Sequence, residues 1–407
     1  MLAPSSIAAA TTLYCDRHEP HAQRIILHKA TSEQTKGQTN KQTSSSSSSM
    51  MTTAPPAKKI LFGNVKDACP TLMDEEHNSG DATTATTPIH DLNYVLNHTK
   101  ASGIAAIANN NYKNNSKPVV EVQHDMTPLD AAKVLWENKI LGAPVWDKDK
   151  QSYVGFFDMR DLLSAVIVAQ KEKDDGWLPS ILTTSYLAAR NPFGPLYNLD
   201  SSLLQICQAL CQNDAHRVPL VDPTTQRCVR ILSQSAIVKF LALCVTAKEF
   251  PALEQTLGLA KFPYKKQVVQ AVDTASARQV FALMDQQRLS GIAIVDHETG
   301  KHIGNTSAVD IKLAIPVDEE EEDEADMDMD ILSYLSAVRQ ERAFLHDQYP
   351  CAHVRESSTV GHALKLLAKT GFHRVFVIDN DGRPVGVISV TDIVKFVVDS
   401  ALAMQGK

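Results

Sequence analysis

The stretch Phe376-Val-Ile-Asp379, followed by the turn residues Asn380-Asp381-Gly382, shows the pattern that decides the fold of this chain. A hydrophobic run that ends in an aspartate and a polar turn is typical of two paired strands. Three earlier segments repeat the run: Pro144-Val-Trp-Asp147, Pro219-Leu-Val-Asp222 and Ala293-Ile-Val-Asp296. Their terminal aspartates are 75, 74 and 83 residues apart, which predicts one structural unit carried four times.

Segments next to these strands favour amphipathic helices. Leu129–Asn138 places Ala132, Leu135 and Trp136 on one helical face. The same spacing recurs later in the chain at Leu203, Ile206, Cys207 and Leu210, and at Val360, Ala363, Leu364 and Leu367. The predicted fold is therefore α/β (α+β), with four β-α-β-β-α repeats. One repeat has too little core to be stable alone, so we expect the repeats to pack in pairs.

The period also predicts boundaries along the chain. Residues 1–88 are rich in Ser, Thr, Gln and Lys and include six consecutive serines, which is typical of a disordered tail. The remaining segments are a spacer with a short helix (Asp91–Asn97) at 89–118, repeat one at 119–170, a linker at 171–194, repeat two at 195–246, a linker at 247–266, repeat three at 267–316, an acidic insertion with a connecting helix at 317–350, and repeat four at 351–404.

A dense acidic block occupies Asp318–Asp330. It has ten acidic residues and no basic ones, whereas the formal net charge of the chain is −7, so the residues outside it sum to +3. Like charges this close repel one another and usually stay solvated. We interpret the block as a loop insertion, which accounts for the longer last spacing.

Composition disfavours several classes of protein. The chain has no run of about 18 apolar residues, so no membrane contact through a spanning helix is expected. The net acidic charge gives no support for nucleic acid as a partner. Seven scattered cysteines favour a reducing compartment, the cytoplasm first, with the nucleus left open as a second location.

Neither a metal site nor an active site is predicted. Cys15, His18 and His21 have ligand-like spacing, but a structural zinc site needs four ligands. The chain lacks the phosphate-binding loop, the Gly-x-Ser-x-Gly motif, the His-Glu-x-x-His motif and Cys-x-x-Cys pairs. We therefore expect a protein that is not an enzyme.

The repeated unit resembles the cystathionine-β-synthase (CBS) domain, two of which form a Bateman module. Four such units without an attached catalytic domain resemble the γ-subunit family of AMP-activated protein kinases. The similarity covers about residues 115–405 and is carried by repeat order, by Ala143-Pro-Val-Trp-Asp147 with Gln151-Ser-Tyr-Val-Gly155, and by His216-Arg217-Val-Pro219. It implies two Bateman modules in a disk-like arrangement. It also implies AMP, ADP or ATP as ligands, no other cofactor, and α-type catalytic and β-type scaffold kinase subunits as partners.

The resemblance implies ligand positions. The family's ribose-binding aspartate is the last residue of a Ser/Thr-x-x-Asp motif. This motif corresponds to Ser307-Ala-Val-Asp310 and Ser389-Val-Thr391-Asp392, and its aspartate corresponds to Asp161 in repeat one. A carboxylate can accept hydrogen bonds from both ribose hydroxyls, and a helix N-terminus suits phosphate. The family's phosphate-facing pair corresponds to His216-Arg217 and His373-Arg374. Further family ligand positions are Ser290 and Arg342.

Each motif has a structural alternative. Ser-x-x-Asp at a helix start is also an N-cap arrangement, and His-Arg beside a buried strand can be a solvated edge. The first two repeats also depart from the family. Asp158 stands at the hydroxyl position and Leu141 at a basic position, while Ser233-Gln-Ser235-Ala236 has no terminal aspartate and has Ser235 in place of a lysine. We therefore expect nucleotide mainly in repeats three and four.

Two functions remain open at this point. The first is a non-catalytic regulatory subunit that senses adenine nucleotides for a Ser/Thr protein kinase complex. The second is a stand-alone CBS-domain sensor of nucleotide or S-adenosylmethionine that regulates another enzyme. Copurification with kinase subunits separates the two.

Overall fold

The structure is a computed structural model, and it describes residues 92–108, 118–172, 183–192, 195–212, 215–247, 250–264, 267–315, 326–341 and 351–405. The predicted tail, Arg342 and most of the acidic insertion lie outside these residues. A search of the described helices finds none with the length and apolar character needed to cross a membrane.

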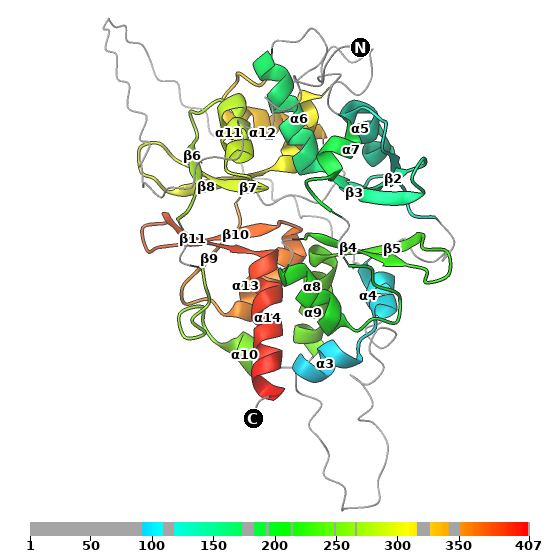
Figure 1. The fold of residues 1–407 in the computed structure, drawn as a ribbon. Coiled ribbons are helices and arrows are strands. Elements are labelled where there is room, and N and C mark those ends of the chain that lie inside the picture. The colour runs from blue at the N-terminus through cyan, green and yellow to red at the C-terminus, as the bar shows by residue number, and fades with distance from the viewer. Residues whose placement is uncertain are drawn as a thin grey trace, which may run out of the picture. The chain divides into compact units, whose positions relative to one another are not determined.

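Each repeat combines a small sheet with two helices (Figure 1). Repeat one has β1 (Val122–Gln123), α5 (Pro128–Glu137), β2 (Gly142–Asp147), β3 (Ser152–Asp158) and α6 (Met159–Glu172). Repeat two has α8 (Leu203–Gln212), β4 (Arg217–Val221), β5 (Cys228–Ser233) and α9 (Gln234–Ala247). Repeat three has β6 (Gln270–Val272), α11 (Ala277–Gln286), β7 (Gly291–Val295), β8 (His302–Ser307) and the 3-10 helix η2 (Ala308–Ala314). Repeat four has β9 (His353–Arg355), α13 (Val360–Thr370), β10 (Arg374–Ile378), β11 (Pro384–Ser389) and α14 (Val390–Gln405).

Five further helices lie outside the repeats in the described chain. They are α3 (Leu92–His98), α4 (Ala101–Ala108), α7 (Thr184–Ala188), α10 (Pro251–Glu254) and α12 (Ile331–Glu341). Of these, α4, α7 and α10 have no counterpart in the sequence-based prediction. Both α3 and α4 contribute buried residues to the core that also holds α8, α9, α13 and α14.

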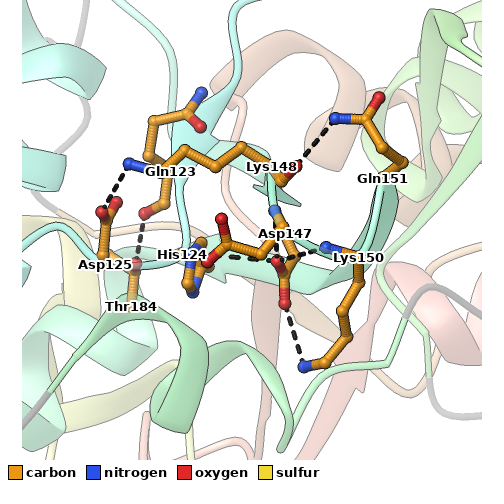
Figure 2. Close-up of polar contacts among 9 residues, drawn as sticks. Gln123, His124, Asp125, Asp147, Lys148, Lys150, Gln151 and Thr184 are labelled. Atoms are coloured by element: carbon orange, nitrogen blue, oxygen red, sulfur yellow. Dashed lines mark hydrogen bonds and ion pairs between the residues drawn. The ribbon is translucent and has the colours of Figure 1, made fainter.

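The strand-ending aspartates fold the turn that follows them. Oδ1 of Asp147 accepts hydrogen bonds from the backbone N–H groups of Asp149 and Lys150, both at 3.0 Å, and Lys150 Nζ lies 2.9 Å from Oδ2 (Figure 2). The Lys150 hydrogen bonds hold the pKa of Asp147 down at about 2. Equivalent bonds to backbone N–H groups are made by Asp222 (from Thr224 and Thr225), Asp296 (from Thr299) and Asp379 (from Arg383). The repeated aspartate is therefore a turn residue.

Two repeats depart from the common pattern. The first strand of repeat two is reduced to a single bridge between Tyr197 and Leu220, because Asn198 begins a turn in which its side chain accepts the N–H of Asp200. In repeat three the last helix is the short η2. The backbone becomes extended at Ile315, as expected for a residue that is followed by a proline, here Pro316.

The helices form two shared cores. One contains buried residues of α5 and α6 together with residues of α11, η2 and α12, so it joins repeats one and three. The other joins repeats two and four through α8, α9, α13 and α14. All eight residues predicted for the core faces of α8 and α13 are buried, while Trp136 of α5 is only partly buried. No repeat completes a core by itself, which confirms the expected packing between repeats.

The sheets make the other set of contacts between repeats. Tyr153 of β3 accepts the N–H of Cys228 of β5 at 2.9 Å, and the Arg227 guanidinium lies 3.9 Å from the ring centre of Trp146. This links repeats one and two. Repeats three and four are linked by the N–H of His302, which donates to the carbonyl of Gly382 at 2.9 Å.

The last part of the acidic block is ordered, although the carboxylates of Asp326, Asp328 and Asp330 stay exposed. Asp328 forms an ion pair with Arg278 of α11 at 2.7 Å, and Met327 is buried. Asp330 accepts the N–H groups of Leu332 and Ser333 and thereby begins α12. Residues 326–330 therefore form a packed helix start, because their carboxylates have specific donors.

Candidate functional site

Strand register brings the predicted ligand residues together within each repeat. The first residue of the central strand lies opposite the last residue of the following strand: Gly142 and Asp158, Arg217 and Ser233, Gly291 and Ser307, and Arg374 and Ser389. The His-Arg position and the Ser-x-x-Asp position therefore meet at the same end of each sheet. Sequence distance between them is irrelevant once this register forms.

In repeat four the first and last residues of the Ser-x-x-Asp motif form hydrogen bonds with each other. Oδ2 of Asp392 accepts the Ser389 N–H at 2.9 Å and the Ser389 hydroxyl at 2.7 Å, while the Asp392 N–H donates to Ser389 Oγ at 3.2 Å. Thr391 donates its hydroxyl to the buried Gln234 side chain of repeat two at 2.9 Å. The N-cap interpretation of this motif is confirmed, and a ribose contact by Asp392 stays a prediction.

Repeat three has a similar arrangement. Oδ2 of Asp310 accepts the Ser307 N–H at 2.7 Å and the hydroxyls of Ser307 and Thr306 at 3.2 Å each. The carbonyl of Ser290 accepts the Ala308 N–H at 3.1 Å, so Ser290 lies beside the start of η2. These bonds hold the Asp310 carboxylate at the end of β8.

The two His-Arg pairs converge, although they come from different repeats. Burial, together with the charges of Arg217 and His216, lowers the pKa of His373 to about 4. Burial and the nearby charge of Arg160 likewise lower the pKa of His216. Hydrogen bonds support this closeness: the N–H groups of Gln234 and Val390 donate to the carbonyls of His216 and His373, and Thr391 bonds to Gln234. Repeats two and four therefore bring together one group of residues, which we call the cationic cluster because of its three arginines: His216, Arg217, His373 and Arg374, with Arg160 from repeat one.

Arg217 already has an anionic partner in the protein. Its Nη1 lies 2.9 Å from Oδ2 of Asp158, with side chains only 13% and 9% exposed, and Nη2 donates to the Leu141 carbonyl at 3.4 Å. Burial raises the pKa of Asp158, but the charges of Arg217 and Arg160 outweigh this and keep it below its ordinary value. The Asp158 carboxylate was predicted to repel phosphate. It forms an ion pair with Arg217, the residue that the resemblance assigns to phosphate binding.

Arg374 differs from Arg217 in its partners. Its Nη1 donates to the carbonyl of Gly291 at 3.4 Å, and among the described residues no carboxylate lies within ion-pair distance of it. Burial and the positive charge of Arg160 lower its pKa to about 10, and Asp392 opposes this shift. Arg374 is thus a partly buried cation, and among the described residues it is compensated only at longer range.

Asp161 lies in a different environment from the other motif aspartates. It is buried, and its Oδ2 accepts the N–H of Asp158 at 2.9 Å. Burial and the negative charge of Asp158 raise its pKa well above the ordinary value. A carboxyl that resists ionisation is a poorer acceptor for sugar hydroxyls.

Arg160 is the member of the cluster that sequence reasoning missed. It occupies the same place in Asp158-Met-Arg160-Asp161 as Thr391 does in the repeat-four motif. That correspondence was the available signal, since the family pattern already marks this position. Its positive charge acts on His216, Arg374 and Asp158. The predicted Arg342 lies outside the described residues.

Comparison with known proteins adds to this geometry. The family model for the CBS domain matches residues 115–168 and 347–399. The chain contains CBS domains. It is 26% identical over 278 residues to 5'-AMP-activated protein kinase subunit gamma-3 of Sus scrofa, covering 64% of this chain and 50% of that protein. It is 24% identical over 301 residues to the gamma subunit of Saccharomyces cerevisiae, covering 70% of this chain and 89% of that protein.

These relatives share the repeats of this CBS-domain chain, which spans about half the length of the pig protein. A solved structure from Methanocaldococcus jannaschii, described as a proposed archaeal homolog of g-AMPK, aligns with a TM-score of 0.52. It is 14% identical and covers 73% of this chain and 99% of that one. This similarity supports the fold of repeated CBS domains.

We expect Asp158→Asn to reduce the free energy of unfolding by about 3–5 kcal/mol, because it leaves the Arg217 guanidinium buried without its partner. Asp158→Asn combined with Arg217→Met should cost less than Asp158→Asn alone. Urea unfolding of the two single variants and the double variant measures the coupling. Strictly additive costs would show that the ion pair contributes nothing specific.

Asp161→Asn should become more stable relative to wild type as the pH rises. The raised pKa means that the unfolded chain ionises Asp161 before the folded chain does, so the wild type loses up to about 1.4 kcal/mol per pH unit above the unfolded pKa. Urea unfolding at pH 5, 6.5 and 8 measures the difference. Asp147→Asn is the control: with a pKa of about 2, Asp147 is ionised in both states above pH 5, so its profile should run parallel to wild type. Parallel profiles for Asp161→Asn would contradict the prediction.

Proposed function

We propose that this chain is a non-catalytic regulatory subunit that senses adenine nucleotides for a Ser/Thr protein kinase complex. Its partners would be an α-type catalytic subunit and a β-type scaffold subunit, and its ligands AMP, ADP or ATP. The similarity to gamma subunits over 64–70% of the chain supports this assignment. The alternative of a sensor for a different enzyme has no observation in its favour here.

The observation that carries the proposal is the environment of Arg374. A partly buried guanidinium without a close carboxylate favours an anionic ligand, and arginine matches the planar, two-pronged geometry of a phosphate group. Arg374 lies beside His373 and across the sheet from Ser389, the first residue of the cap on α14. A phosphate at this point would also be stabilised by the N-terminus of a 16-residue helix.

Asp392 and Asp310 would bind the ribose. Each carboxylate is fixed by donors at the end of a strand, so little conformational entropy is left to lose on binding. Repeats one and two would contribute less, because Asp158 neutralises Arg217 and Asp161 resists ionisation. We therefore assign nucleotide binding chiefly to repeats three and four.

Regulation would follow from the shared position of the cluster. Thr391, next to the ribose-binding Asp392, bonds to Gln234 of repeat two, and the cationic side chains come from three repeats. A nucleotide that binds one arrangement of these repeats more tightly than another shifts the population toward it. The kinase subunits would respond to that shift.

Asp392→Ala and Asp310→Ala should each weaken AMP binding by about 1.5–3 kcal/mol at their own site, because each removes a charged acceptor. Calorimetric titration of the full chain with AMP measures both. Asp381→Ala, an exposed turn aspartate of repeat four, is the control and should bind as wild type does. If the double variant binds AMP as tightly as wild type, the ribose assignment is wrong.

Arg374→Gln should weaken AMP much more than adenosine, which lacks the phosphate. Parallel titrations at fixed ionic strength compare the two ligands, since charged contacts weaken with salt. Arg355→Gln, at an exposed arginine of the same repeat, should change neither affinity. Equal losses for AMP and adenosine would show that Arg374 has no specific role toward phosphate.

A further inference from the structure

We propose that His302, Cys351 and His353 form a zinc site that joins repeat three to repeat four. His302 is the first residue of β8, His353 is the first residue of β9, and Cys351 lies two residues before β9. The site is separate from the cationic cluster, and it does not depend on the proposed nucleotide-sensing function.

The three side chains present their ligand atoms to one another. Cys351 Sγ lies 3.2 Å from His302 Nδ1 and 3.6 Å from His353 Nδ1. One ligand atom from each residue can be chosen so that all three lie within 4.8 Å of one another. With Zn–S near 2.3 Å and Zn–N near 2.0 Å, tetrahedral geometry places S and N roughly 3.5 Å apart. The observed separations therefore suit one zinc ion without rearrangement of the backbone.

The surroundings fix His302 in place. Its side chain is only 8% exposed, its ring packs edge-on against Phe376 at 5.2 Å, and its backbone N–H bonds to Gly382 of repeat four. His353 is exposed and Cys351 is partly buried, so an ion can enter from the surface. One anchored ligand and two accessible ones form a site that is open on one side.

Metal ligation requires neutral imidazoles, and the surroundings of both histidines favour that form. Burial lowers the pKa of His302 to about 4, and burial and the charge of Arg355 lower the pKa of His353. A metal ion would also favour the thiolate form of Cys351, which is the form that binds metal.

Asn305 supplies the outer contact that orients a metal-binding histidine. Its amide group lies 2.6 Å from His302 Nε2. With the amide oxygen toward the ring, Nε2–H donates to it and the Nδ1 lone pair faces Cys351, as ligation requires. With the amide reversed, its nitrogen donates to Nε2 and to the Gly304 carbonyl at 3.0 Å, its oxygen accepts the Ala352 N–H at 3.1 Å, and Nδ1 carries the proton toward the thiol. The reversed orientation satisfies both ends of the amide, so it is the favoured one before metal binds. Zinc binding selects the first orientation.

The donor set favours zinc over other ions. A thiolate and two imidazoles are poor ligands for Mg²⁺ or Ca²⁺, which prefer oxygen, whereas zinc takes Cys and His in tetrahedral sites. Three protein ligands leave the fourth position to water. Two other groups with a histidine, His124 with Asp147 and His297 with Asp296, lack a thiolate, and their aspartates already hold turn N–H groups.

A zinc ion here would tie two segments that are 49 residues apart in sequence. Because the ion binds the folded pair and not the unfolded chain, its binding stabilises repeats three and four together. The sequence gives no sign of the site, since His302 and Cys351 approach only when the two sheets meet.

The test uses the full chain with Cys15→Ser, which removes the thiol of the tail group. Co²⁺ should give a thiolate-to-cobalt absorption band that saturates at one equivalent and disappears when Zn²⁺ is added. Cys351→Ser should abolish the band, whereas Cys211→Ser, at a partly buried cysteine outside the group, should retain it. Absence of the band, or a band unchanged by Cys351→Ser, overturns the proposal.

Thermal unfolding gives a readout that is independent of the spectrum. Zn²⁺ should raise the Tm of the Cys15→Ser chain, and EDTA should reverse the rise. His353→Gln, at an exposed position that should tolerate the change, is expected to weaken Zn²⁺ binding at least tenfold and to remove most of the rise in Tm. Asn305→Ala should weaken Zn²⁺ binding by about 10–100-fold. If Zn²⁺ leaves the Tm of the Cys15→Ser chain unchanged, the three residues form only a thiol–imidazole hydrogen-bonded contact and the proposal is wrong.

Discussion

The structure depends on the fact that no repeat can bury its helices alone. The apolar faces of α8 and α9 in repeat two pack with those of α13 and α14 in repeat four, and the helices of repeats one and three do the same. The sheets then form the contacts within each pair of consecutive repeats. Every repeat therefore has two neighbours, one through its helices and one through its sheet. This constraint brings the strand ends of several repeats to one place.

Charge at that place is unevenly compensated. Arg160, Arg217 and Arg374 come from three repeats and lie close enough to act on the pKa values of the histidines or of one another. Asp158 neutralises Arg217 directly, and Arg374 has only longer-range compensation. A partly buried cation without a close carboxylate favours an anionic ligand, which is the physical basis for assigning it to anion binding.

The Ser-x-x-Asp motifs show how one side chain can serve the fold and still suit a ligand. Asp310 and Asp392 each hold the end of a strand and the start of a helix through the same oxygen, Oδ2. The cap positions the carboxylate before any ligand arrives, so the structural and functional interpretations are compatible. Asp161 is less suited to bind a ligand as a carboxylate, because burial beside Asp158 disfavours its charged form.

The sequence by itself determined the repeats, the turn aspartates and the amphipathic helices, because these depend on local spacing. The strand register that brings the His-Arg and Ser-x-x-Asp positions together came from the structure. The sequence did not reveal which repeats share a core, since apolar faces such as Leu203–Leu210 do not specify their partner. Nor did it reveal that Asp158 would neutralise Arg217, that Arg160 would join the cluster, or that His302 would meet Cys351. Those contacts join residues 49 to 214 positions apart, and only the packing of whole repeats decides distances between such residues.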